Sequence, residues 1–353
     1  MHWREIAGSL DDALAAQAEL KGKRRRGERI VAAKDSPTVE EYATAWLERK
    51  RNLAPGTRAS YEGHLRNHVV RVLGPVRVSK LTDEDVLALL ADSKVRKLRP
   101  ATQAGILRVF GTCLQRAVRD GLLPSNPVRL LERDERPKLT SDDASDVRAL
   151  PSEHIARLLG GAAKIGDDGR ARDMLAIAVF SGLRQSELLA LKWGDIDYRE
   201  GFIRVRAQLE RSTRTLAPLK TKSARRDVIL MPQLARLLRE RQLRSRFSTE
   251  SDFVFGTQDG APMLHRNMTR RVWAKALDRA GLADEGYDLH HLRHSFASIL
   301  ISQGHDVVFV SRQLGHASPV ITLRVYSHLF DARDKAKQAR DALEDEFGAL
   351  ISL

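Results

Sequence analysis

The sequence contains very little cysteine and no long hydrophobic run. Cys113 is the only cysteine among 353 residues, so an intrachain disulfide and a cysteine-based zinc module are both excluded. The longest apolar stretch, MLAIAVF at 174–180, is far too short to cross a bilayer, and the opening residues MHWREIAGSL lack the apolar segment of a secretory signal. We therefore expect a cytoplasmic protein in a reducing compartment, without a membrane partner.

Acidic residues are scarce relative to basic ones. The chain has 46 Asp and Glu against 60 Lys and Arg, which gives a formal net charge of +14. Such an excess favours a polyanionic partner such as nucleic acid, although many proteins carry solvated basic faces. Charge alone therefore does not decide the function, and the motifs have to.

The N-terminal half predicts one helical domain with a segment before it and a linker after it. Residues 1–35 read as a short amphipathic helix followed by the basic run KGKRRRGER, which suits either a flexible linker or an arm that contacts DNA. Residues 36–135 hold four helical patterns, and in the first, SPTVEEYATAWLERK, we expect Ser36 as the N-cap and Pro37 at the first helical position. Proline, serine and charge mark 136–150 as an interdomain linker.

The C-terminal half predicts a second domain, 151–330, that is mostly helical. Two strands, GFIRVRAQ and ARRDVILM, flank the turn PLKTKS and predict a small antiparallel hairpin with that turn at its tip. The tail 331–353 is an amphipathic helix that suits docking on another subunit or on its own domain. The fold class is therefore mainly α with a small antiparallel β-sheet.

A cluster of histidines lies in HHLRHSFASIL, which begins at residue 290. On a helix His290 and His294 are four residues apart and suit a metal, but no third ligand is evident nearby. An imidazole beside the guanidinium of Arg293 instead suits a phosphate, because arginine binds two oxygens while histidine moves a proton.

Two further stretches carry basic side chains at turns. In SGLRQSELLALKW a turn at Ser181 and Gly182 precedes a helix that places Arg184 and Glu187 on one face, an arrangement that also suits a simple salt bridge. The stretch LKTKSARRDVIL carries two lysines at the expected hairpin tip, which also suits a solvated basic loop.

The fourth stretch, LGHASPVITLRVYSHL, predicts a helix that holds a tyrosine. Ser318 is placed to cap this helix and Pro319 to open it, and the helix carries Tyr326 between Val325 and Ser327. By residue type alone, this tyrosine suits a place in the core.

In this order and spacing the stretches resemble the tyrosine recombinase family of the phage-integrase type. Its signature is a TGLRxxEL-like box, a lysine on a β-hairpin, HxLRH, LGH and a tyrosine shortly after, which are matched here by SGLRQSEL, KTKS, HHLRH, LGH and RVYSH. The match covers about 150–330, and the helical unit before it resembles the family's core-binding domain. The resemblance implies a two-domain clamp around duplex DNA, with no cofactor and no metal.

The resemblance also implies the site residues. Tyr326 would be the nucleophile, Arg184 and Arg293 would clamp the phosphate, and His316 would hydrogen-bond to it.

The remaining roles concern proton transfer and support. Lys222 would be the general acid toward the leaving 5′-hydroxyl, with Lys220 as the alternative lysine, and His290 would transfer protons. Glu187 would support the site, and His291 would occupy the variable position of HxLRH.

The implied function is site-specific recombination of a mobile element, such as integration of a phage genome. DNA would be cleaved and rejoined through a 3′-phosphotyrosyl intermediate, by a homotetramer on two recombination sites. A DNA-bending or excision factor is a possible accessory. The protein would be bacterial or phage-encoded and associated with the nucleoid. The alternatives are a catalytically silent DNA-binding regulator, a metal-dependent nuclease that a chelator would inhibit, and a relaxing or nicking enzyme that uses the same tyrosine chemistry.

Overall fold

The computed structural model describes residue 14 and residues 36–138, 148–166, 168–211, 215–219 and 221–330. The chain divides into two compact units, Met1–Ala144 and Ser145–Leu353, and each is described by itself. The expectations for the segment before residue 36, for most of the linker, for Lys220 and for the tail 331–353 lie outside the described residues.

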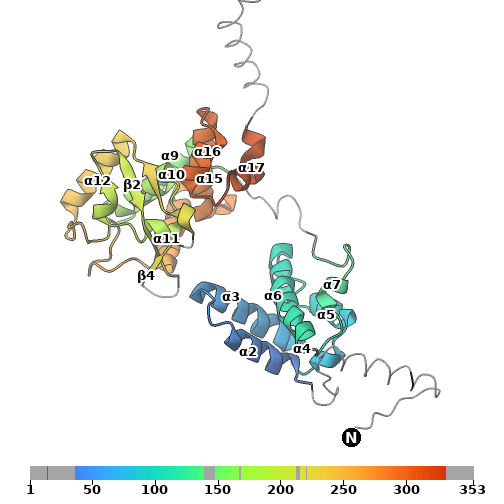
Figure 1. Cartoon of the computed structure of the whole chain (residues 1–353). Helices are drawn as coiled ribbons and strands as arrows, with labels where there is room; N and C mark the ends of the chain where they lie inside the picture. The colour runs from blue at the N-terminus through green and yellow to red at the C-terminus, as the bar shows by residue number, and fades with distance from the viewer. Residues whose placement is uncertain are drawn as a thin grey trace, which may run out of the picture. The chain divides into compact units, whose positions relative to one another are not determined.

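The first unit, blue to teal in Figure 1, is helical, as the sequence predicted. The helix that begins at Pro55 continues as a π-helical stretch, and a short helix follows the long helix that ends at Arg119. The elements are α2 (Val39–Arg49), α3 (Pro55–His64), η2 (Leu65–Val70), α4 (Arg71–Leu73), η3 (Val78–Lys80), α5 (Asp83–Ala91), α6 (Pro100–Arg119) and α7 (Pro127–Leu130). Their inward faces enclose one apolar core, with Trp46, Val69, Leu89 and Phe110 almost fully buried.

The N-cap of α2 differs from the expectation. Thr38 caps the helix: its hydroxyl accepts from the Glu41 backbone N–H at 3.2 Å, and the Glu41 carboxylate accepts from the Thr38 N–H at 2.8 Å. The prediction of Ser36 as the cap was wrong, because the Ser36 hydroxyl accepts from the backbone N–H of Ser79 at 3.1 Å. The Ser36 side chain, which local rules assigned to the helix N-terminus, instead binds Ser79, a residue distant in the sequence.

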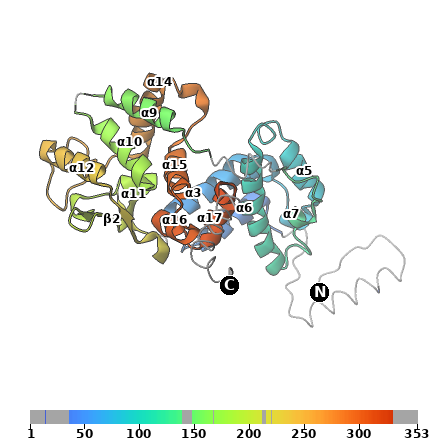
Figure 2. The same cartoon turned by 90° about the horizontal axis from the view of Figure 1, so that it is seen from above.

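The second unit, green to red in Figure 1, is mostly helical and is built around a buried central helix. This helix, α10 (Arg170–Ser181), packs against α9 (Ser152–Ala163), α12 (Pro232–Arg244) and α15 (Leu289–Ser302), an arrangement seen from another side in Figure 2. The other helices are α11 (Gln185–Leu188), η4 (Trp193–Asp195), α13 (His265–Asn267), η6 (Met268–Trp273), α14 (Ala274–Ala280), η7 (Ala283–Glu285), α16 (Val307–Leu314), α17 (Pro319–Tyr326) and η8 (Ser327–Leu329). Within the part of the chain that the structure describes, no helix combines the length and apolar character needed to cross a membrane.

The described residues of this unit also form two small antiparallel sheets. The first has the order β1 (Ile196–Asp197), β2 (Phe202–Val205) and β5 (Arg226–Ile229), with Ile203 opposite Val228. This pairing confirms the predicted hairpin strands, but the predicted tip is wrong. A second pair, β3 (Ala207–Leu209) and β4 (Leu216–Pro218), extends the hairpin, so PLKTKS leads from β4 into a single 3₁₀ turn, η5 (Lys222–Ala224).

Gly182 ends α10 in the left-handed conformation, with φ of +60°. A Cβ atom there would lie 2.3 Å from Cδ1 of Phe296, so Gly182→Ala combines backbone strain with a steric clash in the core. We expect this variant to lose about 2–4 kcal/mol of unfolding free energy, measured by urea denaturation.

Gly160→Ala is the matched control, because Gly160 lies in α9 and a Cβ added there would meet no atom within 4 Å. It should gain up to about 1 kcal/mol. Equal stabilities of the two variants would contradict the steric argument.

Candidate active site

Arg293 joins two glycine-containing turns of the second unit. It projects from α15 and is 3% exposed. Its Nη1 donates to the Gly182 carbonyl at 2.7 Å, and its Nη2 donates to the carbonyl of Leu314, at the end of α16. The SGLR and LGH stretches, far apart in the sequence, therefore meet at one buried guanidinium.

Arg184 reaches the same place from the N-terminus of α11. Its backbone N–H and its Nη1 both donate to the carboxylate of Glu187, at 2.9 and 2.8 Å, and its Nη2 donates to the Gly315 carbonyl at 3.3 Å. The two predicted clamp arginines thus bind the consecutive carbonyls of Leu314 and Gly315. Unlike Arg293, Arg184 keeps 37% of its side chain exposed.

Arg226 is a third arginine of this cluster, and sequence reasoning missed it. It projects inward from β5, and its two terminal nitrogens donate to the Glu187 carboxylate at 3.1 and 2.9 Å. Its Nε donates to the Gln313 carbonyl at 2.7 Å. A signal was present, because Arg226 and Val228 alternate on the buried face of a strand, and a buried arginine requires a carboxylate partner.

The arginine cluster has an excess of positive charge. Burial alone would raise the pKa of Glu187, but the hydrogen bonds and charge of Arg226, with the charge of Arg184, lower it to about 2. Burial and the charges of Arg184 and Arg226 lower the pKa of Arg293 to about 9, so it stays protonated at neutral pH. Three guanidinium groups around one carboxylate leave a region that attracts anions.

The lysine turn η5 lies against the LGH turn. A Cβ added to Gly315 would lie 3.1 Å from the carbonyl oxygen of Ser223 and 3.0 Å from Cδ of Arg226. The Ala224 carbonyl accepts from Arg226 Nη1 at 3.1 Å. The exposed Lys222 therefore comes from a segment fixed beside the arginine cluster.

His291 is part of the N-terminal cap of α15. Asp288 accepts from the backbone N–H of His290 at 2.7 Å, and the Asp288 N–H donates to Nδ1 of the buried His291 at 2.8 Å. His291 thus stabilises the start of the helix, which fits its expected place at the variable position of the motif.

His290 and His316 lie beside the arginine cluster as neutral imidazoles. Burial and the charge of Arg293 hold the pKa of His290 below its usual value, although Asp288 opposes this. Burial and the charges of Arg293 and Arg184 lower the pKa of His316 to about 3. Nδ1 of His316 forms a 2.8 Å hydrogen bond with the hydroxyl of Thr322 on α17, which fixes the orientation of the ring.

Tyr326 is the last residue of α17, whose predicted N-cap, Ser318, is confirmed by a 3.3 Å hydrogen bond from the Val320 N–H. The tyrosine is 1% exposed. Its hydroxyl lies 2.6 Å from Nδ1 of His294. Burial raises the pKa of Tyr326 to about 12, although Arg293 acts in the opposite direction. The phenol is therefore neutral and covered by protein in this state.

His294 was considered in the sequence only as a metal ligand. Its ring lies 4.8 Å, centroid to centroid, from that of His290. Among the described residues, no group of three histidine, cysteine, aspartate or glutamate side chains is arranged to hold a metal ion.

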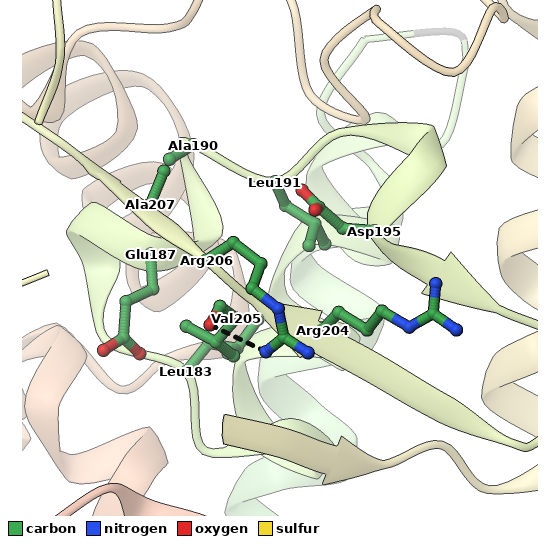
Figure 3. Close-up of a pocket in the computed structure, with 9 residues that line it drawn as sticks. All are labelled: Leu183, Glu187, Ala190, Leu191, Asp195, Arg204, Val205, Arg206 and Ala207. Carbon is green, nitrogen blue, oxygen red and sulfur yellow. Dashed lines mark hydrogen bonds between the residues drawn. The ribbon is translucent and has the colours of Figure 1, made fainter. Parts of the chain in front are cut away.

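A small cavity adjoins the arginine cluster between α11 and the strands β2 and β3 (Figure 3). Glu187 and Leu183 line it, together with Arg204 and Arg206 from the sheet side. Arg206 donates to the Val205 carbonyl at 3.2 Å and to the Asp227 carboxylate at 2.5 Å. Arg204 forms an ion pair with Asp197. These two arginines are engaged within the sheet and therefore belong to its framework.

Two family models and several curated proteins match this chain. Residues 148–333 match the model of the phage integrase family, and residues 38–102 match that of the phage integrase N-terminal SAM-like domain. The integrase of Mycobacterium phage L5 is 27% identical over 93% of this chain and 88% of its own length. Tyrosine recombinase XerD of Yersinia pestis is 27% identical over 85% of this chain and 95% of its own length.

Solved structures share the fold. The integrase of the transposon Tn1549, in complex with a circular intermediate DNA, superposes with a TM-score of 0.74 at 19% identity, covering 87% of this chain and 100% of that one. A lambda integrase tetramer bound to a Holliday junction gives a TM-score of 0.63 at 17% identity, covering 93% of this chain and 89% of that one. The predicted fold class is thereby confirmed.

Proposed function

This chain belongs to the phage integrase family and is a tyrosine-type site-specific DNA recombinase, and from this premise we propose that Tyr326 is the residue that cuts DNA. Its hydroxyl oxygen attacks a backbone phosphorus, the bond from phosphorus to the 5′-oxygen breaks, and the phenol proton passes to a base. The 3′-phosphotyrosyl bond keeps the energy of the diester, so the 5′-hydroxyl of a second strand can attack it and rejoin DNA without ATP.

The observation that carries this proposal is the meeting of Arg184 and Arg293 at the LGH turn, directly before the helix that bears Tyr326. Displacement at phosphorus places additional negative charge on the nonbridging oxygens, and preorganised guanidiniums stabilise that charge. Arg184 is exposed enough to contact a phosphate. Arg293, from its buried position, adds positive charge and holds the two turns together.

The histidines and the lysine complete the proposed chemistry. His290 takes part in transfer of the phenol proton, and His316, held by Thr322 through Nδ1, donates to a phosphate oxygen through Nε2. Lys222 protonates the leaving 5′-oxygen, because an alkoxide departs slowly unless it is protonated. Glu187 supports the site by holding Arg184 and Arg226.

The covered position of Tyr326 sets a requirement for this mechanism. Ionising an ordinary tyrosine at neutral pH costs roughly 4 kcal/mol, and burial raises that cost here, as the pKa of about 12 indicates. Attack on DNA therefore requires that the segments covering the phenol move aside and that the positive charge of the arginines offset the cost of ionisation.

Strand transfer tests the function. The purified protein is incubated with labelled duplexes from the two flanks of its own genomic locus, with and without EDTA. We expect joined products and a protein–DNA adduct on a denaturing gel, and both should persist in EDTA. Loss of activity in EDTA would favour the metal-dependent nuclease, and nicking without exchange would favour a relaxing enzyme.

The two lysines of KTKS make a matched pair for the assignment of the general acid. Lys222→Ala should slow cleavage by about 10²–10⁴-fold, whereas Lys220→Ala should cleave close to the normal rate. A substrate with sulfur in place of the leaving 5′-oxygen should restore the rate of Lys222→Ala, because a thiolate departs without a proton. The reverse pattern in the two variants would transfer the role to Lys220.

The finer organisation follows from the same proposal. Residues 36–135 form the core-binding domain and residues 151–330 form the catalytic domain, with 136–150 as the linker between them. Both domains bind duplex DNA at a recombination site. Four protomers act on two sites of a mobile element, a proposal supported by the lambda integrase tetramer that is bound to a Holliday junction. A DNA-bending or excision factor, and DNA contacts by residues 1–35, complete the proposed assembly.

A further inference from the structure

The hydroxyl of Tyr326 is bound by a residue that has no role in the chemistry described above. His294 projects from α15, and its Nδ1 lies 2.6 Å from the Tyr326 oxygen, with the two ring centroids 5.7 Å apart and inclined at 60°. His294 also contacts His290, since the centroids of these two rings are 4.8 Å apart. His294 is thus a direct hydrogen-bond partner of the proposed nucleophile.

The direction of this hydrogen bond follows from the protonation of the two groups. Burial, with the neighbouring His290, His291 and Arg293, lowers the pKa of His294 to about 4, while Asp288 opposes this. The imidazole is therefore neutral at neutral pH, and the tautomer that carries its proton on Nε2 accepts through Nδ1. The phenol, whose pKa burial raises to about 12, keeps its proton and donates it.

We propose that His294 is a positioning residue for the nucleophile: its Nδ1 accepts the hydrogen bond of the Tyr326 hydroxyl and fixes the direction of the phenol oxygen relative to the arginine cluster. This inference rests on the proposed function of Tyr326. A base role is disfavoured, because the phenol holds its proton far more tightly than this imidazole would. His294 therefore orients the oxygen, and the proton leaves by another group.

Three substitutions of His294 test the acceptor. Asparagine places its amide oxygen close to the position of a histidine Nδ1, so His294→Asn keeps an acceptor, whereas glutamine places its amide one bond further out. Phenylalanine keeps the ring but has no acceptor. We expect His294→Phe to bind the recombination-site duplex normally and to form the phosphotyrosyl adduct about 100-fold more slowly. His294→Asn should recover most of the rate, and His294→Gln should not.

The readout is single-turnover adduct formation on a nicked duplex that carries the recombination site, with His305→Phe as the control histidine. His305 stacks on Phe309 in the same unit, and phenylalanine keeps that ring contact, so the rate should be unchanged. The substrate with a leaving 5′-sulfur gives a second readout: it should restore Lys222→Ala but not His294→Phe, because His294 acts on the attacking oxygen.

The outcomes separate this inference from the proposed function. If His294→Phe cleaves at the normal rate, or if His294→Asn is as slow as His294→Phe, the positioning role is overturned, while an adduct formed by the unchanged protein and lost in Tyr326→Phe still supports the function. If the unchanged protein forms no adduct, the proposed function fails first. If His294→Phe does not fold, judged by its melting curve, the Asn and Gln variants decide: a faster Asn variant supports the role, and equal rates overturn it.

Discussion

Tyr326→Phe is expected to form no covalent adduct with DNA, a loss of more than about 10⁴-fold in cleavage. The substitution removes only the hydroxyl oxygen, and the ring continues to fill its almost fully buried place at the end of α17. The hydrogen bond to His294 is lost, which should reduce the stability by roughly 1–3 kcal/mol. A labelled nicked duplex on a denaturing gel measures the adduct, and a mobility-shift assay should show that DNA binding is retained.

Tyr198→Phe is the matched control for this variant. Tyr198 belongs to the same unit, and its hydroxyl makes a longer hydrogen bond, 3.4 Å, to Gln242. It should form the adduct at the normal rate. A covalent adduct from Tyr326→Phe would refute the assignment of the nucleophile, whatever the control shows.

Arg184→Lys is expected to slow adduct formation by about 10²–10³-fold with little change in DNA binding. The guanidinium divides its contacts between Glu187 and the Gly315 carbonyl and still exposes 37% of the side chain. A lysine retains the charge, but it has no planar fork with which to hold these partners and two phosphate oxygens together. Single-turnover cleavage of the nicked duplex measures the rate.

Arg204→Lys is the control for charge geometry, because Arg204 pairs with Asp197 on the sheet, outside the arginine cluster. Its cleavage rate should be normal. A rate for Arg184→Lys close to that of the unchanged protein would show that Arg184 acts only as a structural partner of Glu187.

Local rules predicted much of the fold and part of the site. Ser318 and Pro319 begin α17 and Gly182 ends α10, since capping hydroxyls, proline and glycine act through the backbone next to them. The cap at Thr38 and the hairpin tip were missed for a different reason. The Ser36 hydroxyl bonds to Ser79, and the strands β3 and β4 are too short for a clear alternation.

The two site residues that the sequence did not reveal depend on contacts between distant segments. Arg226 reads as one of several arginines in a basic stretch until Glu187 is placed beside it. His294 reads as a metal ligand until α17 brings Tyr326 to its Nδ1. The family signature identifies the positions at which the chemistry is expected, whereas the partners that orient those side chains appear only when the helices are packed.

The hydrogen bonds of Arg293 affect the order in which mutations would remove the site residues in a lineage that no longer needs the activity. Removal of its side chain would leave the carbonyls of Gly182 and Leu314 without their donor, a penalty of roughly 1–3 kcal/mol for each. Tyr326→Phe removes only one hydrogen bond, and Arg184 is partly exposed, so either exchange costs less folding free energy than loss of Arg293. Degenerate copies in old, immobile elements should therefore lose the tyrosine or Arg184 early and keep Arg293 for as long as the protein still folds.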